Sequence, residues 1–202
     1  MDSSVVVLYR KRETCPIYPK LNHAFQILGI EPRLVLSDEA LRDLFREAGK
    51  QVHPDAGGGE GEFAALRDAY ATLASPSRRL MRWLELRGTP GEVRGSIEAA
   101  LMDLFSEVGA VTQQADAVIR KREEARSPLV RALLESETQV SREAVEQTIF
   151  KVESWITQEC SDFSNWEVAE VIEVDAISQV ARNLAFLEKW RGSLRACFSR
   201  LV

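Results

Sequence analysis

The chain has 202 residues, of which 45% are hydrophobic and 28% charged, and its formal net charge at pH 7 is −5. This composition is typical of a folded globular protein, and it excludes collagen-like, low-complexity and wholly disordered chains. The acidic balance argues against a general nucleic-acid binder, which needs a basic surface. No apolar run approaches the ~20 residues that cross a bilayer, and three isolated cysteines suit a reducing compartment. We therefore expect a cytoplasmic protein without nucleic-acid or membrane partners.

Periodic apolar residues predict four helices in the first part of the chain, after a weak strand-like run at residues 5–9. Ser37 stands where the N-cap of the second helix belongs, and Asp38 and Glu39 place negative charge on its first turn. Pro76 suits the first turn of the fourth helix. The expected helices cover about residues 24–28, 41–52, 63–73 and 76–88.

Three longer helices are predicted beyond the turn-forming residues 88–91. The first has apolar residues in steps of four and three from Ile97 to Val118, the pattern of a coiled-coil seam. The second spans Val145 to Ile156 with Ser141 as its expected cap, and the third spans Ile177 to Phe198 with Asp175 as its expected cap. Such amphipathic helices should close into a three-helix bundle. The acidic stretch 153–175, with seven carboxylates and no Lys or Arg, has no predicted structure.

Charge is spread unevenly over these two parts. Residues 1–88 carry 13 basic and 12 acidic side chains, whereas residues 89–202 carry 13 basic and 19 acidic ones. This imbalance indicates two regions with different partners. We predict an all-α chain with an N-terminal extension (1–20), a helical hairpin domain with flanking short helices (21–88), a linker (89–95) and a three-helix bundle (96–202).

The most informative segment lies at the end of the helix over residues 41–52. Arg42, Arg46 and Lys50 are four residues apart, so they share one helix face. His53-Pro54-Asp55 follow, then the glycine-rich residues 56–61 and a second amphipathic helix that can pair antiparallel with the first. Acidic side chains lie close to the basic ones, so the basic face by itself favours an ordinary exposed helix with ion pairs.

This combination resembles the J domain of the DnaJ family. The resemblance implies a helical hairpin that docks on an ATP-bound DnaK-type heat-shock chaperone and triggers ATP hydrolysis. It also implies that the basic helix face meets an acidic surface of the chaperone, and that the HPD tripeptide couples docking to hydrolysis. The implied chaperone contacts are Arg42, Arg46, Lys50, His53, Pro54 and Asp55.

The resemblance extends to the HscB branch of this family, called Jac in eukaryotes, which serves iron–sulfur cluster assembly. Residues 22–30 are similar to the start of HscB proteins, and residues 69–76, continuing through Leu84, Leu86 and Gly88, follow the same pattern. Residues 182–191 resemble the last HscB helix. The resemblance covers about residues 22–108 and 177–200.

In HscB proteins the C-terminal bundle holds the IscU-type scaffold on which the cluster is built. The scaffold contacts that the resemblance implies here are Leu101, Met102, Phe105 and Phe186. Leu101 is equally compatible with the bundle core. Ser106 and Gly109 stand where HscB proteins usually have acidic residues, and Ala185 where an Arg is common. A J protein with another client, or a helical adaptor, is therefore the alternative function.

An enzyme is the least favoured class. His53 and Asp55 could form an acid–base pair, but no nucleophile or oxyanion donor is indicated near them. His23 and His53 could bind a metal ion, but no third ligand accompanies them. We therefore predict a protein that is not an enzyme and has no metal and no cofactor. The cysteines Cys15, Cys160 and Cys197 are interpreted as packing residues or surface thiols.

Overall fold

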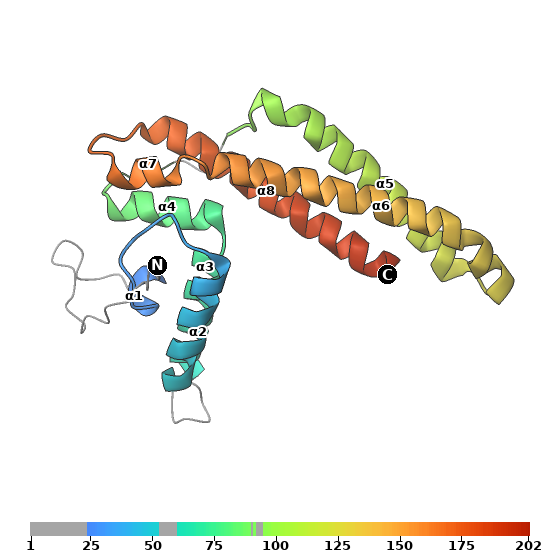
Figure 1. The fold of residues 1–202 in the computed structure, drawn as a ribbon, viewed down its shortest axis with the longest axis horizontal. Coiled ribbons are helices and arrows are strands. Elements are labelled where there is room, and N and C mark those ends of the chain that lie inside the picture. Colours follow the sequence, from blue (N-terminus) through green and yellow to red (C-terminus); the bar gives the residue numbers. More distant parts are fainter. Residues whose placement is uncertain (1–23, 53–59, 90, 92–94) are drawn as a thin grey trace, which may run out of the picture. The chain divides into compact units, whose positions relative to one another are not determined.

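Figure 1 shows the computed structural model of the chain, which describes residues 24–52, 60–89, 91 and 95–202. All regular elements within these ranges are helices, which confirms the predicted all-α fold class. The chain divides into two compact units between Ala74 and Ser75. None of the helices in the described ranges is long and apolar enough to span a bilayer. The strand-like pattern at residues 5–9 lies outside the described residues.

The first unit contains a pair of packed helices preceded by a short one. Its elements are α1 (Ala24–Ile27), α2 (Asp38–Val52) and α3 (Glu60–Leu73), and α3 packs against both α1 and α2. Ser37 caps α2 as predicted, because its Oγ accepts a hydrogen bond from the N–H of Ala40 at 3.2 Å. The largest buried side chains of this unit are Phe25, Leu34, Leu41, Leu66 and Leu73.

Aromatic contacts fix which face of α2 points outward. The ring of Phe45 lies 4.7 Å from that of Tyr70 and 6.5 Å from that of Phe63, measured between centroids. Leu41, one turn before Phe45, is fully buried. Since this side of α2 packs on α3, the basic side chains on its other side face the solvent.

The second unit is built around three long helices, α5 (Met102–Glu124), α6 (Pro128–Glu159) and α8 (Val174–Leu201). Each of the three packs against the other two, and a 3-10 turn, η2 (Ala99–Leu101), leads into α5. Their apolar seams form the core, which confirms the predicted three-helix bundle. The buried seam residues include Leu104, Val108, Val118, Val145, Val152, Ile177, Leu184, Leu187 and Leu194.

The helix α4 (Pro76–Leu86) packs on α8 and is held there by Glu188. The carboxylate of Glu188 accepts hydrogen bonds from the Ser75 hydroxyl at 2.6 Å and from the Ser77 N–H at 3.0 Å. Ser75 also caps α4 by accepting from the N–H of Arg78 at 3.2 Å. The second compact unit therefore begins at Ser75, whereas the predicted hairpin domain extends to residue 88. The predicted domain boundaries stay a prediction, because a division by contacts need not follow a division by function.

Two predicted helix caps in the bundle are wrong. α6 begins at Pro128, and its cap is Ser127, whose Oγ accepts from the N–H of Val130 at 3.2 Å. Ser141 is buried in the middle of this helix. The apolar side chains in the first turns of α6 are exposed. These turns therefore lack the buried apolar seam that predicts a helix, and the predicted start lies too late in the chain. α8 begins at Val174, so Asp175 lies inside its first turn and provides no cap.

The acidic stretch 153–175 contains the end of α6, a short helix α7 (Phe163–Val168) and the start of α8. Phe163 is buried. The Arg87 guanidinium donates hydrogen bonds to the carbonyl oxygens of Glu167 at 3.1 Å and Ala169 at 3.2 Å. It also lies 4.1 Å from the centroid of the Trp83 ring. These contacts anchor the end of α7 to α4.

Candidate docking surfaces

The face of α2 that carries Arg42, Arg46 and Lys50 is exposed. Nη1 of Arg46 lies 2.9 Å from Oδ1 of Asp43, and Nζ of Lys50 lies 2.7 Å from Oε2 of Glu47. Exposed pairs of this kind contribute about 0–1 kcal/mol. No ion pair of Arg42 is seen within the described ranges. The face can therefore exchange its own carboxylates for those of a partner at little cost.

The predicted residues His53, Pro54 and Asp55 lie outside the described residues. Before them α2 ends at Val52, and after them α3 begins at Glu60. Their role in a chaperone contact stays a prediction based on the J-domain resemblance.

An aromatic and apolar surface, here called the α5–α8 patch, is formed by Met102 and Phe105 of α5 and Phe186 of α8. The side chains of Met102 and Phe105 are 48% and 50% exposed, and Phe186 is half-buried. The structure therefore brings these three predicted residues to the surface of the bundle. Neighbouring apolar side chains that stay exposed on two packed helices mark a candidate interface.

Trp190 of α8 supports the α5–α8 patch. The centroid of its buried ring lies 5.7 Å from that of Phe105 and 6.2 Å from that of Phe186. Such aromatic pairs stabilise each other by about 0.5–1.5 kcal/mol. Trp190 falls within the helix predicted from Ile177 to Phe198, where an aromatic side chain by itself indicates only core packing. Its position four residues after Phe186, on the same helix face, is the signal that could have placed it beneath the patch.

Leu101, the fourth predicted scaffold contact, is 0% exposed and belongs to the core of the second unit. Of the two roles that the sequence allows for Leu101, the structure therefore supports core packing. Its side chain holds the start of α5 in place and does not reach the surface of the patch.

Two positions beside the patch differ from the acidic residues expected there. The hydroxyl of Ser106 donates a hydrogen bond to the carbonyl oxygen of Met102 at 3.1 Å, so it is directed toward its own helix. A Cβ at Gly109 would have no heavy atom within 4 Å, so this position leaves open space. The patch therefore carries no side-chain charge at either position.

A buried amide joins two carboxylates near the α5–α8 patch, at the end of the bundle where α5 and α8 begin. Nδ2 of Asn183 donates hydrogen bonds to Glu98 at 3.0 Å and to Glu159 at 3.1 Å. Burial raises the pKa of the Glu159 carboxyl, the hydrogen bond from Asn183 lowers it, and the nearby charge of Glu98 raises it. The net pKa lies above the usual value of 4.5. This cluster secures the segment before α5 to α8 and α6.

The described cysteines fit their interpretation as packing residues. Burial raises the pKa of the Cys160 thiol to about 11, and it also raises that of Cys197. Few thiolates are therefore present at neutral pH. Cys15 lies outside the described residues. Within the described ranges, no three His, Cys, Asp or Glu side chains gather in a way that could hold a metal ion.

Comparisons with known proteins find relatives by sequence, while no model of a protein family matches the chain. The Co-chaperone protein HscB homolog of Aeromonas salmonicida is 37% identical over 84 residues, which cover 37% of this chain and 47% of the relative. The Tetratricopeptide repeat and J domain-containing co-chaperone DNJ1 of Cryptococcus neoformans is 40% identical over 55 residues, which cover 27% of this chain and 10% of the relative. The chain therefore spans less than half the length of these curated relatives.

A solved structure resembles the chain over most of its length. The chaperone HscB from Vibrio cholerae matches with a TM-score of 0.51 and 18% sequence identity, and the match covers 89% of this chain and 99% of that one. At this identity the match establishes a shared fold.

Proposed function

We propose that the chain, which resembles HscB-type J-domain co-chaperones, stimulates ATP hydrolysis by a DnaK/HscA-type heat-shock chaperone. We further propose that it delivers an IscU-type scaffold to that chaperone for the maturation or transfer of an iron–sulfur cluster. One observation carries this proposal: a match by sequence and a match by fold point independently to the same kind of protein.

The first unit makes the chaperone contact in this proposal. The α2 face with Arg42, Arg46 and Lys50 attracts an acidic surface of the chaperone, and exposed cations of this kind raise association rates. His53, Pro54 and Asp55 couple docking to hydrolysis, a role that follows from the J-domain resemblance.

The α5–α8 patch receives the scaffold. Met102 and Phe105 are half exposed and Phe186 lies beside them on the Trp190 ring. Large, preorganised apolar groups at the centre of an interface supply most of its affinity. Leu101 contributes by holding the start of α5.

The mechanism is a coupling of two binding events on one chain. A scaffold bound to the patch is tethered to the docked chaperone, which raises its effective concentration there. Hydrolysis of ATP then shifts the chaperone toward the state that holds the client tightly. The chain itself supplies binding surfaces and no reacting group.

The test is single-turnover ATP hydrolysis by a DnaK/HscA-type chaperone, first with this protein alone and then with the IscU-type scaffold of the same organism. We expect stimulation by the protein alone and a further, joint increase when the scaffold is added. Stimulation that ignores the scaffold would contradict delivery and leave a J protein with another client. An unchanged hydrolysis rate in both experiments would overturn the J-domain function.

A different client is the second candidate. The observation in its favour is the absence of side-chain charge at Ser106 and Gly109, together with Ala185 in place of an Arg. A client with a more apolar surface than an IscU-type scaffold would suit these positions. Binding titrations with the scaffold separate the two candidates.

A further inference from the structure

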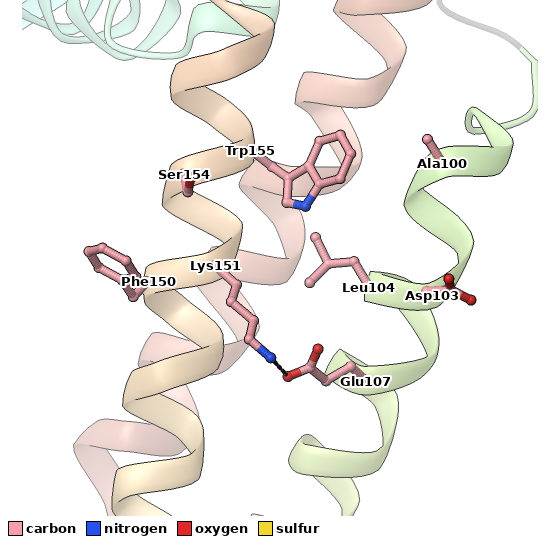
Figure 2. Close-up of a pocket in the computed structure, with 8 residues that line it drawn as sticks. All are labelled: Ala100, Asp103, Leu104, Glu107, Phe150, Lys151, Ser154 and Trp155. Carbon is pink, nitrogen blue, oxygen red and sulfur yellow. Dashed lines mark hydrogen bonds and ion pairs between the residues drawn. The ribbon is translucent and has the colours of Figure 1, made fainter.

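A groove lies between α5 and α6, away from the α5–α8 patch. Its volume is about 400 Å³, and its lining includes Ala100 from η2, Leu104 from α5 and Trp155 from α6. Figure 2 shows Leu104 and Trp155 directed into the space between the two helices. Ligand pockets begin at about 300 Å³, so the groove has room for an apolar side chain of a partner.

An ion pair crosses the groove at one end. Nζ of Lys151 on α6 lies 2.6 Å from Oε1 of Glu107 on α5, and Figure 2 shows the two side chains reaching toward each other. This pair links the two helices at the level where the groove ends. The groove therefore has a defined end even without a partner.

Phe150 lies at the edge of the groove on α6 and is 74% exposed. Figure 2 shows its ring on the side of α6 that faces away from α5. The ring thus contributes little to the core of the bundle. Exposed aromatic side chains beside a pocket are enriched at protein–protein interfaces, where they anchor the partner.

The groove and the α5–α8 patch are joined around the outer face of α5. Successive residues of an α-helix are rotated by about 100°. Phe105, Met102, Asp103 and Glu107 therefore follow one another around the exposed side of α5, from the patch to the groove. Asp103 is exposed, and no ion pair of its carboxylate is seen in the part of the chain that the structure describes. An uncompensated negative charge thus lies between the two surfaces.

We infer that the α5–α6 groove is a second part of the scaffold-docking surface, so that the scaffold contacts α5 from both sides. The contact in the groove is an apolar side chain of the scaffold next to a Lys or Arg. The apolar side chain packs between Leu104 and Trp155, and the cation meets Asp103. This inference rests on the proposed function, since the occupant is the scaffold.

Charge supports a basic segment as the occupant. Residues 89–202 carry 13 basic and 19 acidic side chains. Glu107 is neutralised by Lys151, which leaves Asp103 as the local charge that a partner can meet. Complementary charges steer association and disfavour acidic partners.

A variant that fills the groove tests the inference with little risk to folding. Ser154 lines the groove and is exposed, so Ser154→Trp adds bulk where the scaffold side chain would lie. Ser136 is also exposed and lies on the same face of α6, 18 residues earlier, which corresponds to five helical turns or about 27 Å. Ser136→Trp is therefore the matched control.

The measurement is the Kd of the IscU-type scaffold by isothermal titration, together with ATPase stimulation without scaffold. We expect Ser154→Trp to weaken scaffold binding at least tenfold, while Ser136→Trp binds as the wild type does and both variants stimulate the ATPase normally. Asp103→Lys should weaken binding about threefold to tenfold, and more so at low salt.

Each outcome separates the inference from the function on which it rests. If the wild type binds the scaffold and Ser154→Trp binds it equally well, the groove is not part of the interface and the proposed function stands. If the wild type does not bind the scaffold, the delivery function fails and the inference fails with it. Ser154→Trp could instead leave scaffold binding unchanged and alter the oligomeric state measured by sedimentation. The groove would then be a contact between copies of this chain, and the inference would be overturned.

Discussion

The outer faces of α2 and α5 carry the two candidate docking surfaces, and their chemistry differs. On α2 the surface consists of long charged side chains, of which Arg46 and Lys50 pair with carboxylates of their own helix. On α5 the surface is apolar, and Phe105 rests on the buried Trp190 ring of α8. Charges act over about 8–10 Å at physiological salt, whereas apolar groups act only on contact.

This difference fits the two kinds of partner that we propose for the chain. A charged, mobile surface favours rapid docking that is sensitive to salt. A rigid aromatic surface favours a long-lived complex that salt changes little, because its affinity comes from apolar area removed from water. The first surface suits a chaperone that binds and leaves in each cycle, and the second suits a client that must be retained until transfer.

The largest expected effect is in the first unit. We expect Asp55→Asn to reduce ATPase stimulation to the unstimulated rate, because the resemblance assigns this carboxylate to the contact that couples docking to hydrolysis. Scaffold binding should stay unchanged, since it belongs to the other unit. Single-turnover hydrolysis measures the first effect and titration the second. Circular dichroism is the control, and a loss of helix content would mean that Asp55 is structural.

Leu101→Ala and Met102→Ala sharpen the distinction between core and surface within the second unit. Leu101 is 0% exposed, so Leu101→Ala should lower the free energy of unfolding by about 2–5 kcal/mol. Met102 is half exposed, so Met102→Ala should change it by no more than about 0.5 kcal/mol. Urea denaturation of both variants measures the difference. Equal effects would contradict the placement of Leu101 in the core.

The combined change Met102→Ala, Phe105→Ala and Phe186→Ala tests the α5–α8 patch. We expect scaffold affinity to fall about 10–100-fold, equivalent to about 1.4–2.7 kcal/mol, because large apolar contacts are lost. ATPase stimulation without scaffold should match that of the wild type. Titration with the scaffold at two salt concentrations should give the same fold-loss of affinity, since the substitutions remove no charge. An unchanged scaffold affinity would argue against the patch.

The smallest expected effect concerns pH and Glu159. Its pKa is raised in the folded protein, so the stability that it contributes is fully present below the unfolded-state pKa and is lost as the pH rises through the folded-state pKa. Glu159→Gln should therefore stabilise the protein at pH 7, within about 1 kcal/mol, and the gain should vanish at acidic pH. Thermal unfolding across pH measures this. If Glu159→Gln still stabilised the protein at acidic pH, the stabilisation would not come from the removed charge.

Local signals in the sequence predict much of the fold. The cap Ser37 needs only a side-chain oxygen and a nearby backbone N–H, so residues three apart suffice to identify it. The seams of the long helices are likewise visible as periodic apolar residues. The same signal fails at the start of α6, where the helix is exposed and Ser127, not Ser141, is its cap.

The candidate sites divide in the same way. The sequence by itself determined the basic face of α2, because residues three or four apart share a helix face, and the resemblance to HscB proteins indicated Met102 and Phe105 on α5. Only the tertiary structure decided that Leu101 is buried, that Trp190 supports Phe105, and that a groove lies between Leu104 and Trp155. These features depend on which helices meet and in which register. That arrangement follows from the packing of the whole bundle, so no short segment of the sequence determines it.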